Sequence, residues 1–234
     1  APDARPDVRP ALGLIDLRSN FSDGVYDVET LVRMAKERGF SVVIINDHDR
    51  MAMEYGLPPL RNVVKKSEQR SAINLWGASS WLHVIREVEK KYPEMIVIPG
   101  TETAPFYHWT GSPVTGDLTA WNHERRVLTV GLESPEDYET LPVLHNGFTT
   151  RWMNLALPGI VAFLAALVVA GFMIRWKGFY RIAGIAVVAL SLAFIANSDP
   201  FRSSPFDPYS GDQGITPWQL LIDDVRGKGG LTFW

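Results

Sequence analysis

Residues 40–50 read FSVVIINDHDR, an uninterrupted apolar and β-branched run that ends in charged and polar residues. Such a run is typical of a strand that is buried on both faces of a sheet. Residues 28–38 (VETLVRMAKER) carry apolar side chains at helical spacing, and Gly39 stands where a helix C-cap glycine belongs. The stretch therefore predicts a helix that leads into a buried parallel strand, with residues 47–49 at the carboxyl end of that strand.

The same alternation of strand and helix extends to both sides of this stretch. Residues 13–17 (GLIDL) predict a strand before the helix, and residues 79–92 (SSWLHVIREVEKKY) predict a second amphipathic helix. Two further strands are predicted at residues 95–100 (MIVIPG) and 127–132 (VLTVGL). The order strand, helix, strand, helix, strand favours parallel βαβ units, in which site residues collect at the carboxyl ends of the strands. The candidate site residues at these ends are Asp16, Arg18, Asp47, His48 and Glu102.

Two long apolar segments interrupt this pattern. Residues 155–174 (LALPGIVAFLAALVVAGFMI) contain no charge, and residues 182–196 (IAGIAVVALSLAFIA) reach a similar length once residues 179–180 and 197–198 are counted as interfacial. About twenty such residues span the hydrocarbon core of a bilayer as a helix. The alternative is a pair of buried core helices in a soluble protein, which the Trp, Lys and Arg residues at the segment ends disfavour. The pattern therefore predicts a two-helix transmembrane hairpin.

The link between the two segments, residues 175–181 (RWKGFYR), carries three positive charges and no negative charge. By the positive-inside rule this loop is predicted to be cytoplasmic, with both flanking polar segments across the membrane. We therefore expect a protein of the inner (cell) membrane whose soluble domain is periplasmic or extracellular. The expected division of the chain is an extended N-terminal tail (1–12), the first part of the soluble domain (13–153), the hairpin (154–198) and the continuation of the soluble domain (199–234).

Composition narrows the classes of function. The net charge of −3 and the lack of a basic patch or stripe argue against a nucleic-acid partner. The sequence has no cysteine, which excludes disulfides and thiolate metal sites. Its Pro-rich, charged start (APDARPDVRP) fits a chain trimmed after a small-residue cleavage site as well as a sequence that begins where order begins.

Three blocks of the chain resemble the PHP (polymerase and histidinol phosphatase) family. They read DLRSNFSDGVYDVETLVRMAKERG (16–39), GFSVVIINDHDR (39–50) and VIPGTET (97–103), and they cover most of residues 13–132. The resemblance implies an α/β fold, a PHP-like distorted βα barrel, complete or incomplete, which the transmembrane hairpin interrupts. It also implies the chemistry of the family, whose members bind two or three metal ions and hydrolyse phosphoesters.

The chain departs from this family at the first metal-binding block. There the family has His-x-His before a Ser-x-x-Ser-Asp-Gly turn, whereas this chain has Asp16 and Arg18. The second block ends in Asn-Asp-His instead of Thr-Asp-His, and it keeps the histidine as His48. The resemblance therefore implies that this chain lacks two of the family's histidine ligands at its first strand.

The later blocks are similarly mixed. The third block supplies a bridging glutamate in the family, and Glu102 matches it. A later family histidine is matched by Arg126, and His123, three residues earlier, is the alternative. Further family ligands begin at a His-Pro pair after a strand. Residues 227–234 (GKGGLTFW) resemble the approach to that pair, and the sequence ends at Trp234.

The two arginines give this site a different expected chemistry. A guanidinium group cannot donate an electron pair to a metal, and it places a permanent positive charge where the cation would lie. We expect that Arg18 and Arg126 have replaced a metal and offset the remaining carboxylates, and that Asp16 pairs with one of them. The prediction is a vestigial site without a cofactor, made of Asp16, Arg18, Asp23, Asp47, His48, Glu102 and Arg126. If a metal is retained, Zn or Mn is expected on Asp16, His48, Glu102 and His123.

Two classes of function follow. The first, which we favour, is a non-catalytic, membrane-anchored structural or assembly subunit of a larger bacterial membrane complex, in contact with lipid and other membrane subunits. Small residues favour close helix packing in the hairpin, at Gly159, Ala162, Ala166 and Ala170. For the aromatic segment 105–113 (PFYHWTGSP), two interpretations are equally favoured: it packs in the core, or it forms a docking surface for another subunit. The second class is an exported metal-dependent phosphoesterase with a membrane anchor.

Overall fold

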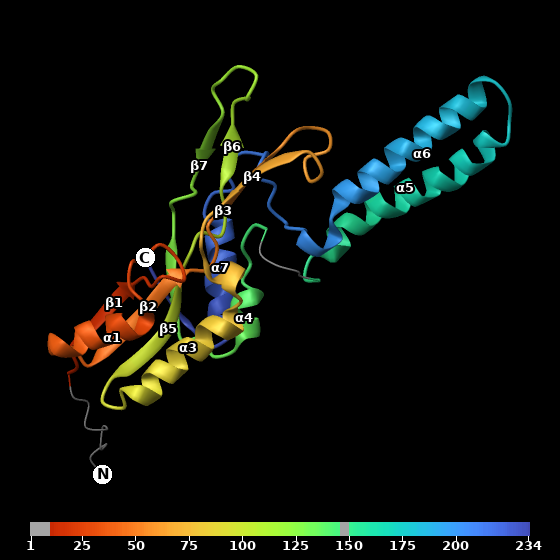
Figure 1. The fold of residues 1–234 in the computed structure, drawn as a ribbon. Coiled ribbons are helices and arrows are strands. Elements are labelled where there is room, and N and C mark those ends of the chain that lie inside the picture. Colours follow the sequence, from red (N-terminus) through yellow and green to blue (C-terminus); the bar gives the residue numbers. More distant parts are fainter. Residues whose placement is uncertain (1–9, 146–149) are drawn as a thin grey trace, which may run out of the picture.

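The computed structural model describes residues 10–145 and 150–234 and consists of an α/β part and a helical hairpin that projects from it (Figure 1). Of the expected N-terminal tail, residues 1–9 lie outside the described residues. The hairpin leaves the α/β part at one end, and the chain then returns to add the last helix and strand. The sequence on both sides of the hairpin therefore contributes to one sheet.

The α/β part is built on one five-stranded sheet. Its strands, in spatial order, are β1 (Gly13–Leu17), β2 (Val42–His48), β5 (Ile96–Thr103), β8 (Val127–Val130) and β9 (Leu231–Phe233). β1, β2 and β5 are parallel, as the helices between them predict. The sheet is curled like half a barrel, and over the described residues it does not close into a complete barrel.

The strand predicted at residues 127–132 forms as β8 over Val127–Val130. β8 runs antiparallel to β5, with Val127 opposite Thr103. In the fully described segment between these strands no helix crosses the sheet; the chain runs out and back through β6 (His108–Thr110) and β7 (Thr119–Trp121). An antiparallel pair needs no helical crossover, so β8 joins the sheet beside the parallel strands β1, β2 and β5 without a βαβ unit of its own.

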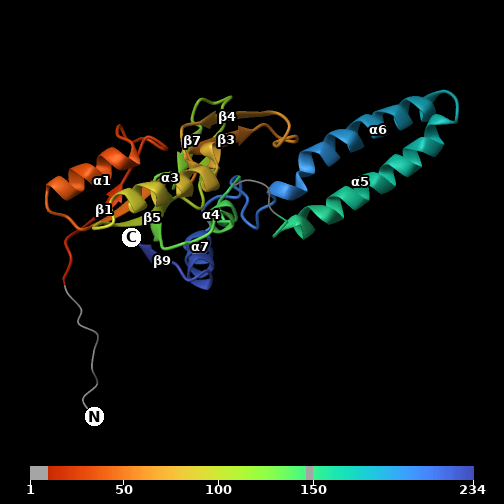
Figure 2. The same cartoon turned by 60° about the horizontal axis from the view of Figure 1, so that its bottom comes forward.

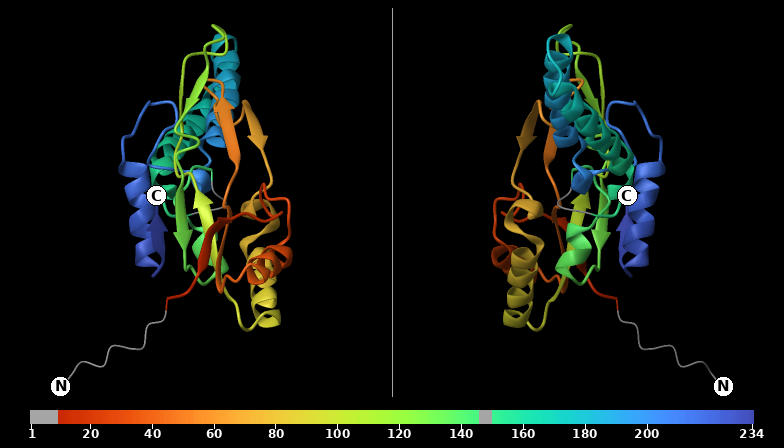
Figure 3. Two further views of the ribbon diagram at one scale, coloured as in Figure 1. Left: turned by 90° about the vertical axis from the view of Figure 1, so that its left-hand side faces the viewer. Right: turned by 90° about the vertical axis from the view of Figure 1, so that its right-hand side faces the viewer.

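Helices cover both faces of the sheet (Figure 3). α1 (Val28–Glu37) and α3 (Ala78–Lys91) lie on one face, with the short α2 (Ile73–Trp76) before α3 and α4 (Pro135–Glu139) packed beside α3. α7 (Thr216–Gly227) lies on the other face and contacts β9. Because helices cover both faces, the continuous apolar sequence of β2 is buried on both sides.

The core joins residues from before and after the hairpin. Trp218 of α7 is fully buried, and its ring meets Phe106 edge-on with 6.3 Å between the ring centroids. Trp81 of α3 is also fully buried and meets Tyr138 edge-on at 5.1 Å. β9 pairs with β8 and so adds the last strand from beyond the hairpin. The hairpin is therefore an insertion into a structural unit with a shared core.

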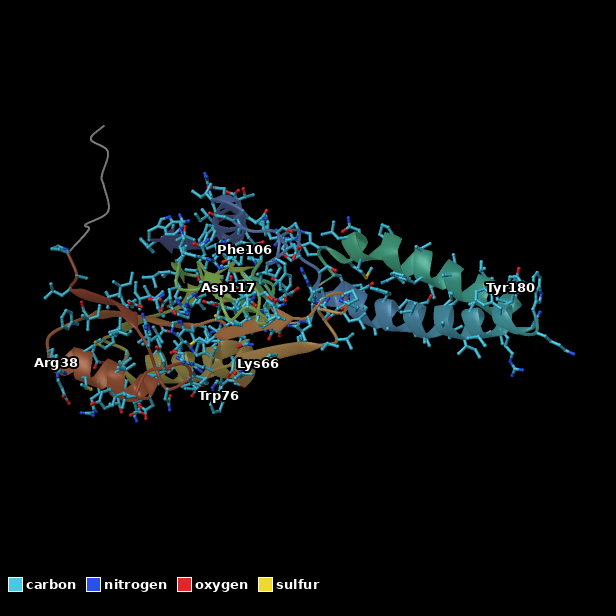
Figure 4. The ribbon with its side chains drawn as sticks, turned by 90° about the horizontal axis from the view of Figure 1, so that it is seen from above. Arg38, Lys66, Trp76, Phe106, Asp117 and Tyr180 are labelled. Carbon is cyan, nitrogen blue, oxygen red and sulfur yellow. The ribbon has the colours of Figure 1, made fainter. Side chains whose placement is uncertain are left out.

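The hairpin consists of α5 (Met153–Ile174) and α6 (Phe179–Ser198), which pack side by side; Tyr180 lies at its far end (Figure 4). Both helices are long and apolar enough to cross a membrane, and only 6% and 11% of their most apolar windows are buried. This exposure contradicts the alternative of two buried core helices. Gly184 lies so close to α5 that a Cβ on it would come within 3.0 Å of the Ala170 carbonyl oxygen, whereas Gly159 is exposed.

Two smaller elements lie where the hairpin joins the α/β part. β3 (Ala52–Gly56) and β4 (Lys65–Gln69) form a two-stranded antiparallel ribbon whose connecting loop lies next to the base of the hairpin (Figures 1 and 2). The short 3-10 helix η1 (Pro200–Arg202) follows α6 and leads the chain back toward the sheet. These elements place charged residues at the junction.

Candidate functional site

One edge of the sheet collects most of the predicted site residues. His48 ends β2 and lies directly opposite Glu102 of β5 in the parallel register. Arg126 precedes β8, and because β8 is antiparallel, its start lies beside the end of β5. Asp16 and Arg18 lie at the end of β1. Parallel and antiparallel strands thus deliver charged side chains to the same edge.

Six residues at this edge form a connected set of ion pairs and hydrogen bonds, which we name the Glu102 cluster: Asp16, Arg18, Asp23, His48, Glu102 and Arg126. The guanidinium of Arg18 lies 2.9 Å from Glu102 Oε2 through its Nη2. It also lies 3.4 Å from Asp23 Oδ2 and 3.5 Å from Asp16 Oδ2. Burial works to lower the pKa of Arg18, but the charges of these three carboxylates outweigh it and raise the pKa.

The two ring nitrogens of His48 have different partners. Nδ1 lies 2.9 Å from Arg126 Nη1 and 3.2 Å from Glu102 Oε2, and Nε2 lies 3.3 Å from Asp23 Oδ2. A guanidinium only donates, so Nδ1 accepts the hydrogen bond from Arg126. On the other side of the ring, Nε2 faces the Asp23 carboxylate. Arg126 therefore uses the lone pair with which Nδ1 would bind a metal.

Glu102 is held between both arginines. Its side chain is 13% exposed, Oε2 faces Arg18, and Oε1 lies 3.8 Å from Arg126 Nε. A divalent cation on Glu102 and His48 would lie against two guanidinium groups that keep their charge at all physiological pH values. The donor set present here does not fit a metal ion.

Asn46 orients the end of β1 from inside the sheet. Asp16 has φ 64°, a left-handed conformation that aspartate adopts more readily than most residues. Its backbone N–H donates to Asn46 Oδ1 at 3.2 Å, and Asn46 Nδ2 donates to the carbonyl of Thr129 at 3.4 Å. The position of Asp16 next to Arg18 thus depends on a residue that is not among the predicted site residues.

Asp47 lies outside the Glu102 cluster, contrary to the expectation that an arginine offsets its charge. It is fully buried and accepts hydrogen bonds from neutral donors: Ser19 N at 2.7 Å, Ser19 Oγ at 2.7 Å, Ser22 Oγ at 2.6 Å and Trp81 Nε1 at 2.9 Å. Successive strand residues point to opposite faces, so Asp47 points away from the side of His48. Its role is to tie the turn after β1 to β2 and α3.

A cavity of 440 Å³ opens beside the Glu102 cluster. Arg126, Arg50 and Arg70 contribute its positive groups, and Met51, Met53, Tyr107 and Leu144 contribute apolar wall. His123, the alternative metal ligand, lines this cavity and pairs with Glu124 at 3.4 Å. Arg50 and Arg70 are absent from the predicted site; the position of Arg50 directly after the 47–49 strand end is the signal that could have indicated it.

A second charged cluster lies at the base of the hairpin. Glu54 of β3, 8% exposed at its side chain, contacts Lys65 of β4 at 2.8 Å and Arg202 of η1 at 3.2 Å. Arg50 at 3.9 Å and His145 at 3.6 Å complete the Glu54 cluster. Its members are scattered over the sequence before and after the hairpin, so no short motif could have indicated it.

Burial and charge lower the pKa values of two groups of the Glu54 cluster, Glu54 and His145. Burial alone would raise the pKa of Glu54, but the hydrogen bond and charge of Lys65 and the charges of His145 and Arg202 lower it to about 2. Burial lowers the pKa of His145 to about 4, although the charge of Glu54 opposes this shift. At neutral pH Glu54 is therefore ionised and His145 is neutral.

Asp49 feels the charge of an arginine from each of the two clusters. Burial raises the pKa of its carboxyl to about 7, against the lowering effect of the charges of Arg126 and Arg50. One of these arginines belongs to each cluster. Asp49 is thus an acid whose ionisation is costly in the folded state and which titrates near neutral pH.

The aromatic segment 105–113 is divided between core and surface. Phe106, Tyr107 and His108 are buried at 0%, 5% and 7% exposure. Tyr107 Oη accepts a hydrogen bond from the backbone N–H of Glu54 at 2.8 Å. Core packing therefore accounts for the first half of the segment, and only its end is accessible to another subunit.

Comparison with known proteins gives little guidance. No family model matches the sequence, and no curated protein matches it. Among solved structures, a candidate metal-dependent phosphoesterase from Bifidobacterium adolescentis matches with a TM-score of 0.38 and 17% sequence identity. The match covers 95% of this chain and 66% of that protein. Likeness at this level assigns no reaction to this chain.

Proposed function

We propose that this chain is a non-catalytic, membrane-anchored PHP-like protein that acts as a structural or assembly subunit of a larger bacterial membrane complex. The observation that carries the proposal is the position of the two guanidinium groups: Arg18 at 2.9 Å from Glu102 and Arg126 at 2.9 Å from His48. In this proposal they take the place of the metal ions of the PHP family, and no cofactor is bound. The complete or incomplete βα barrel of that family is part of the same proposal.

The physical argument concerns charge. A carboxylate at 13% exposure needs a compensating positive charge, which a metal supplies in a hydrolytic site. Here Arg18 supplies the positive charge. A guanidinium group cannot coordinate a water molecule and activate it as a metal ion does. In this proposal the ion pairs stabilise the edge of the sheet in place of the Lewis acid that metal-assisted hydrolysis requires.

The hairpin supplies the membrane anchor in this proposal. Its apolar side chains are exposed along both helices, and the link between them carries Arg175, Lys177 and Arg181. The positive-inside rule then places the link in the cytoplasm and the α/β part on the outer (periplasmic) face. We expect an impermeant amine label added from outside intact cells to spare Lys177 and to react with exposed Lys66 of the α/β part once the outer membrane is opened. Labelling of Lys177 alone would reverse the orientation.

The central test combines metal content, activity and size. The full chain is extracted in mild detergent, and its size, its Mn and Zn content and its hydrolysis of a panel of phosphoesters are followed in the same fractions. We expect co-migration with a large membrane assembly, substoichiometric metal and no hydrolysis. A small free species that holds stoichiometric metal and cleaves phosphoesters would establish the alternative, an exported metal-dependent phosphoesterase.

A matched variant makes this test sharper. In Asp16→His/Arg18→His both histidines of the family's first block are restored while the rest of the chain is unchanged. We expect no phosphoesterase activity in this variant, because Arg126 still occupies His48 Nδ1. Activity that appears with added Mn or Zn would contradict the assignment of Arg126.

A further inference from the structure

The loop between β3 and β4, residues 57–64 (LPPLRNVV), presents apolar side chains to the outside of the protein. Leu57, Val63 and Val64 are 46%, 51% and 47% exposed, and Pro58 and Pro59 are also exposed. Exposed apolar residues that occur singly need no explanation, but a contiguous set on one loop indicates a surface with a partner. The question is which partner this loop contacts.

Two hydrogen bonds to the hairpin set the position of the loop. The backbone N–H of Asn62 donates to Asn197 Oδ1 at 2.8 Å, and Asn62 Nδ2 donates to the Asn197 carbonyl at 2.6 Å. That carbonyl belongs to the last turn of α6, where helix carbonyls lack intrahelical partners. The 57–64 loop therefore caps the end of α6, and Figures 1, 2 and 4 show the β3–β4 ribbon ending beside the base of the hairpin.

The end of α6 is also the level at which a membrane-crossing hairpin meets the headgroup layer. Trp152 at the start of α5 and Phe201 in η1 lie at this same end, and Phe201 is 40% exposed. Aromatic rings of this kind are typical of the membrane–water interface. A loop bonded to Asn197 thus lies at interfacial depth.

The backbone of the loop suits a partly apolar environment. Leu57 N donates to the Val64 carbonyl at 2.8 Å, and Val63 N and Val64 N donate to the Leu60 carbonyl at 3.0 and 2.7 Å. Pro58 and Pro59 carry no N–H, and the N–H of Asn62 is used by Asn197. At every exposed position of the loop, the backbone donor is therefore bonded or absent. Such a loop can leave water without stranding hydrogen-bond donors.

The loop is also held in a fixed conformation, so that it loses little conformational entropy when it contacts a partner. Gly56 approaches the Arg61 carbonyl so closely that an added Cβ would lie 2.0 Å from its oxygen, which restricts this position to glycine. The Arg61 guanidinium lies 3.8 Å from the centre of the Tyr209 ring. Lys66, 81% exposed at its side chain, follows the loop, and its ammonium group lies 3.0 Å from Glu68 in an exposed ion pair.

We infer that the 57–64 loop enters the headgroup layer of the same membrane that the hairpin crosses. The inference rests on the proposed membrane hairpin and adds a second, monotopic contact to it. The lipid surface is the occupant that fits, because a loop capped onto α6 meets lipid wherever α6 leaves the bilayer. Two contacts, one through the hairpin and one through the loop, fix the tilt of the α/β part against the membrane.

The test uses the absence of cysteine from the sequence, which allows single labels without background substitutions. Three variants of the full chain are labelled with an environment-sensitive fluorophore and reconstituted in vesicles: Val63→Cys, Val25→Cys and Leu164→Cys. Val25 is the matched control, an 86% exposed valine between β1 and α1, the elements at the far end from the hairpin in Figure 1. Leu164, 49% exposed within α5, reports whether the hairpin itself is in the bilayer.

We expect the Val63 label to shift to shorter wavelength and to be quenched severalfold more by lipids spin-labelled near the headgroup than the Val25 label. The Leu164 label should be quenched by lipids spin-labelled deep in the chain. If Leu164 is quenched and Val63 is as accessible to aqueous iodide as Val25, the loop inference is wrong and the membrane hairpin stands. If Leu164 is not quenched by lipid, both the anchor and the loop contact are wrong.

Discussion

The Glu102 cluster and the Glu54 cluster use the same chemistry for different ends. In each, a nearly buried glutamate is surrounded by arginine and other positive groups. The Glu102 cluster lies at strand ends that the sequence predicts, and its Arg18 is 34% exposed. The Glu54 cluster joins the β3–β4 ribbon to the segment that leaves the hairpin. The Glu102 cluster balances the charges of a candidate site, whereas the Glu54 cluster connects two regions of the chain. We therefore expect substitutions in the two clusters to change the free energy of unfolding by different amounts.

The largest effect is expected from Glu54→Gln. The substitution leaves Lys65, Arg202 and Arg50 around a neutral side chain, and breaking a buried pair in this way costs about 3 kcal/mol of unfolding free energy. Denaturant unfolding of the detergent-solubilised chain, followed by tryptophan fluorescence, measures the loss. Glu68→Gln on the neighbouring strand is the control, because Glu68 is 74% exposed and its pair with Lys66 contributes little. Equal effects of the two substitutions would show that the Glu54 cluster does not connect the regions.

A loss of about 2 kcal/mol is expected from Asp47→Asn, because buried donors lose an acceptor oxygen. Asp47 sharpens the comparison, since it is as buried as Glu54 but is held by neutral donors rather than cations. The same unfolding assay applies, and Asn is chosen because it keeps the shape of the side chain. A change below that of an exposed control such as Asp117→Asn would contradict the structural role of Asp47.

The pH dependence of stability should separate Asp49 from His145. The folded pKa of Asp49, about 7, is above its ordinary value of 3.8, so the unfolded chain loses this proton first and stability falls as the pH rises between these values. The folded pKa of His145, about 4, is below its ordinary value of 6.5, so stability falls as the pH drops between these values.

These two contributions are measured by comparing unfolding free energies from pH 4 to pH 8 in the unsubstituted chain, Asp49→Asn and His145→Gln. Relative to the unsubstituted chain, Asp49→Asn should gain stability toward pH 8, and His145→Gln should gain stability toward pH 4. Parallel curves for all three proteins would contradict both assignments.

The smallest effect is expected from Arg18→Gln. Because Arg18 is 34% exposed at its side chain, solvent screens its ion pairs, and we expect a loss below about 1 kcal/mol. Arg202→Gln is the comparison in the other cluster and should cost more, because it acts on the less exposed Glu54. A larger loss for Arg18 than for Arg202 would reverse the distinction between site and connection.

Local patterns predicted the elements that depend on neighbours in the sequence. The apolar run of residues 40–50 predicts β2 because burial on both faces leaves a direct mark on composition. The absence of charge over residues 155–174 predicts α5 for a similar reason. The direction of β8 was not predictable in this way, since the strand sequence is the same for either direction and only the missing crossover helix decides it.

The same reasoning explains which contacts the sequence could indicate. The resemblance places Arg18 and Arg126 at positions of metal ligands, and the structure brings both to Glu102. For Asp47 the motif was misleading, because a carboxylate next to His48 in the sequence is typical of a site residue. Side chains alternate along a strand, so Asp47 points into the core, where Trp81 donates a hydrogen bond to it. Glu54 gave no signal, because Lys65 reaches it only across the β3–β4 ribbon and Arg202 only after the chain has returned from the hairpin.

The insertion of the hairpin between β8 and β9 has a consequence for biogenesis. β8 is translated before the hairpin and α7 and β9 after it, so the sheet keeps an unpaired edge and Phe106 lacks Trp218 until the chain beyond α6 has emerged. With the hairpin in a membrane, as proposed above, the α/β part can finish folding only when both ends of the hairpin have reached the same side of that membrane. On that topology, a chain arrested after α5 leaves the β8 edge that pairs with β9 open to other chains.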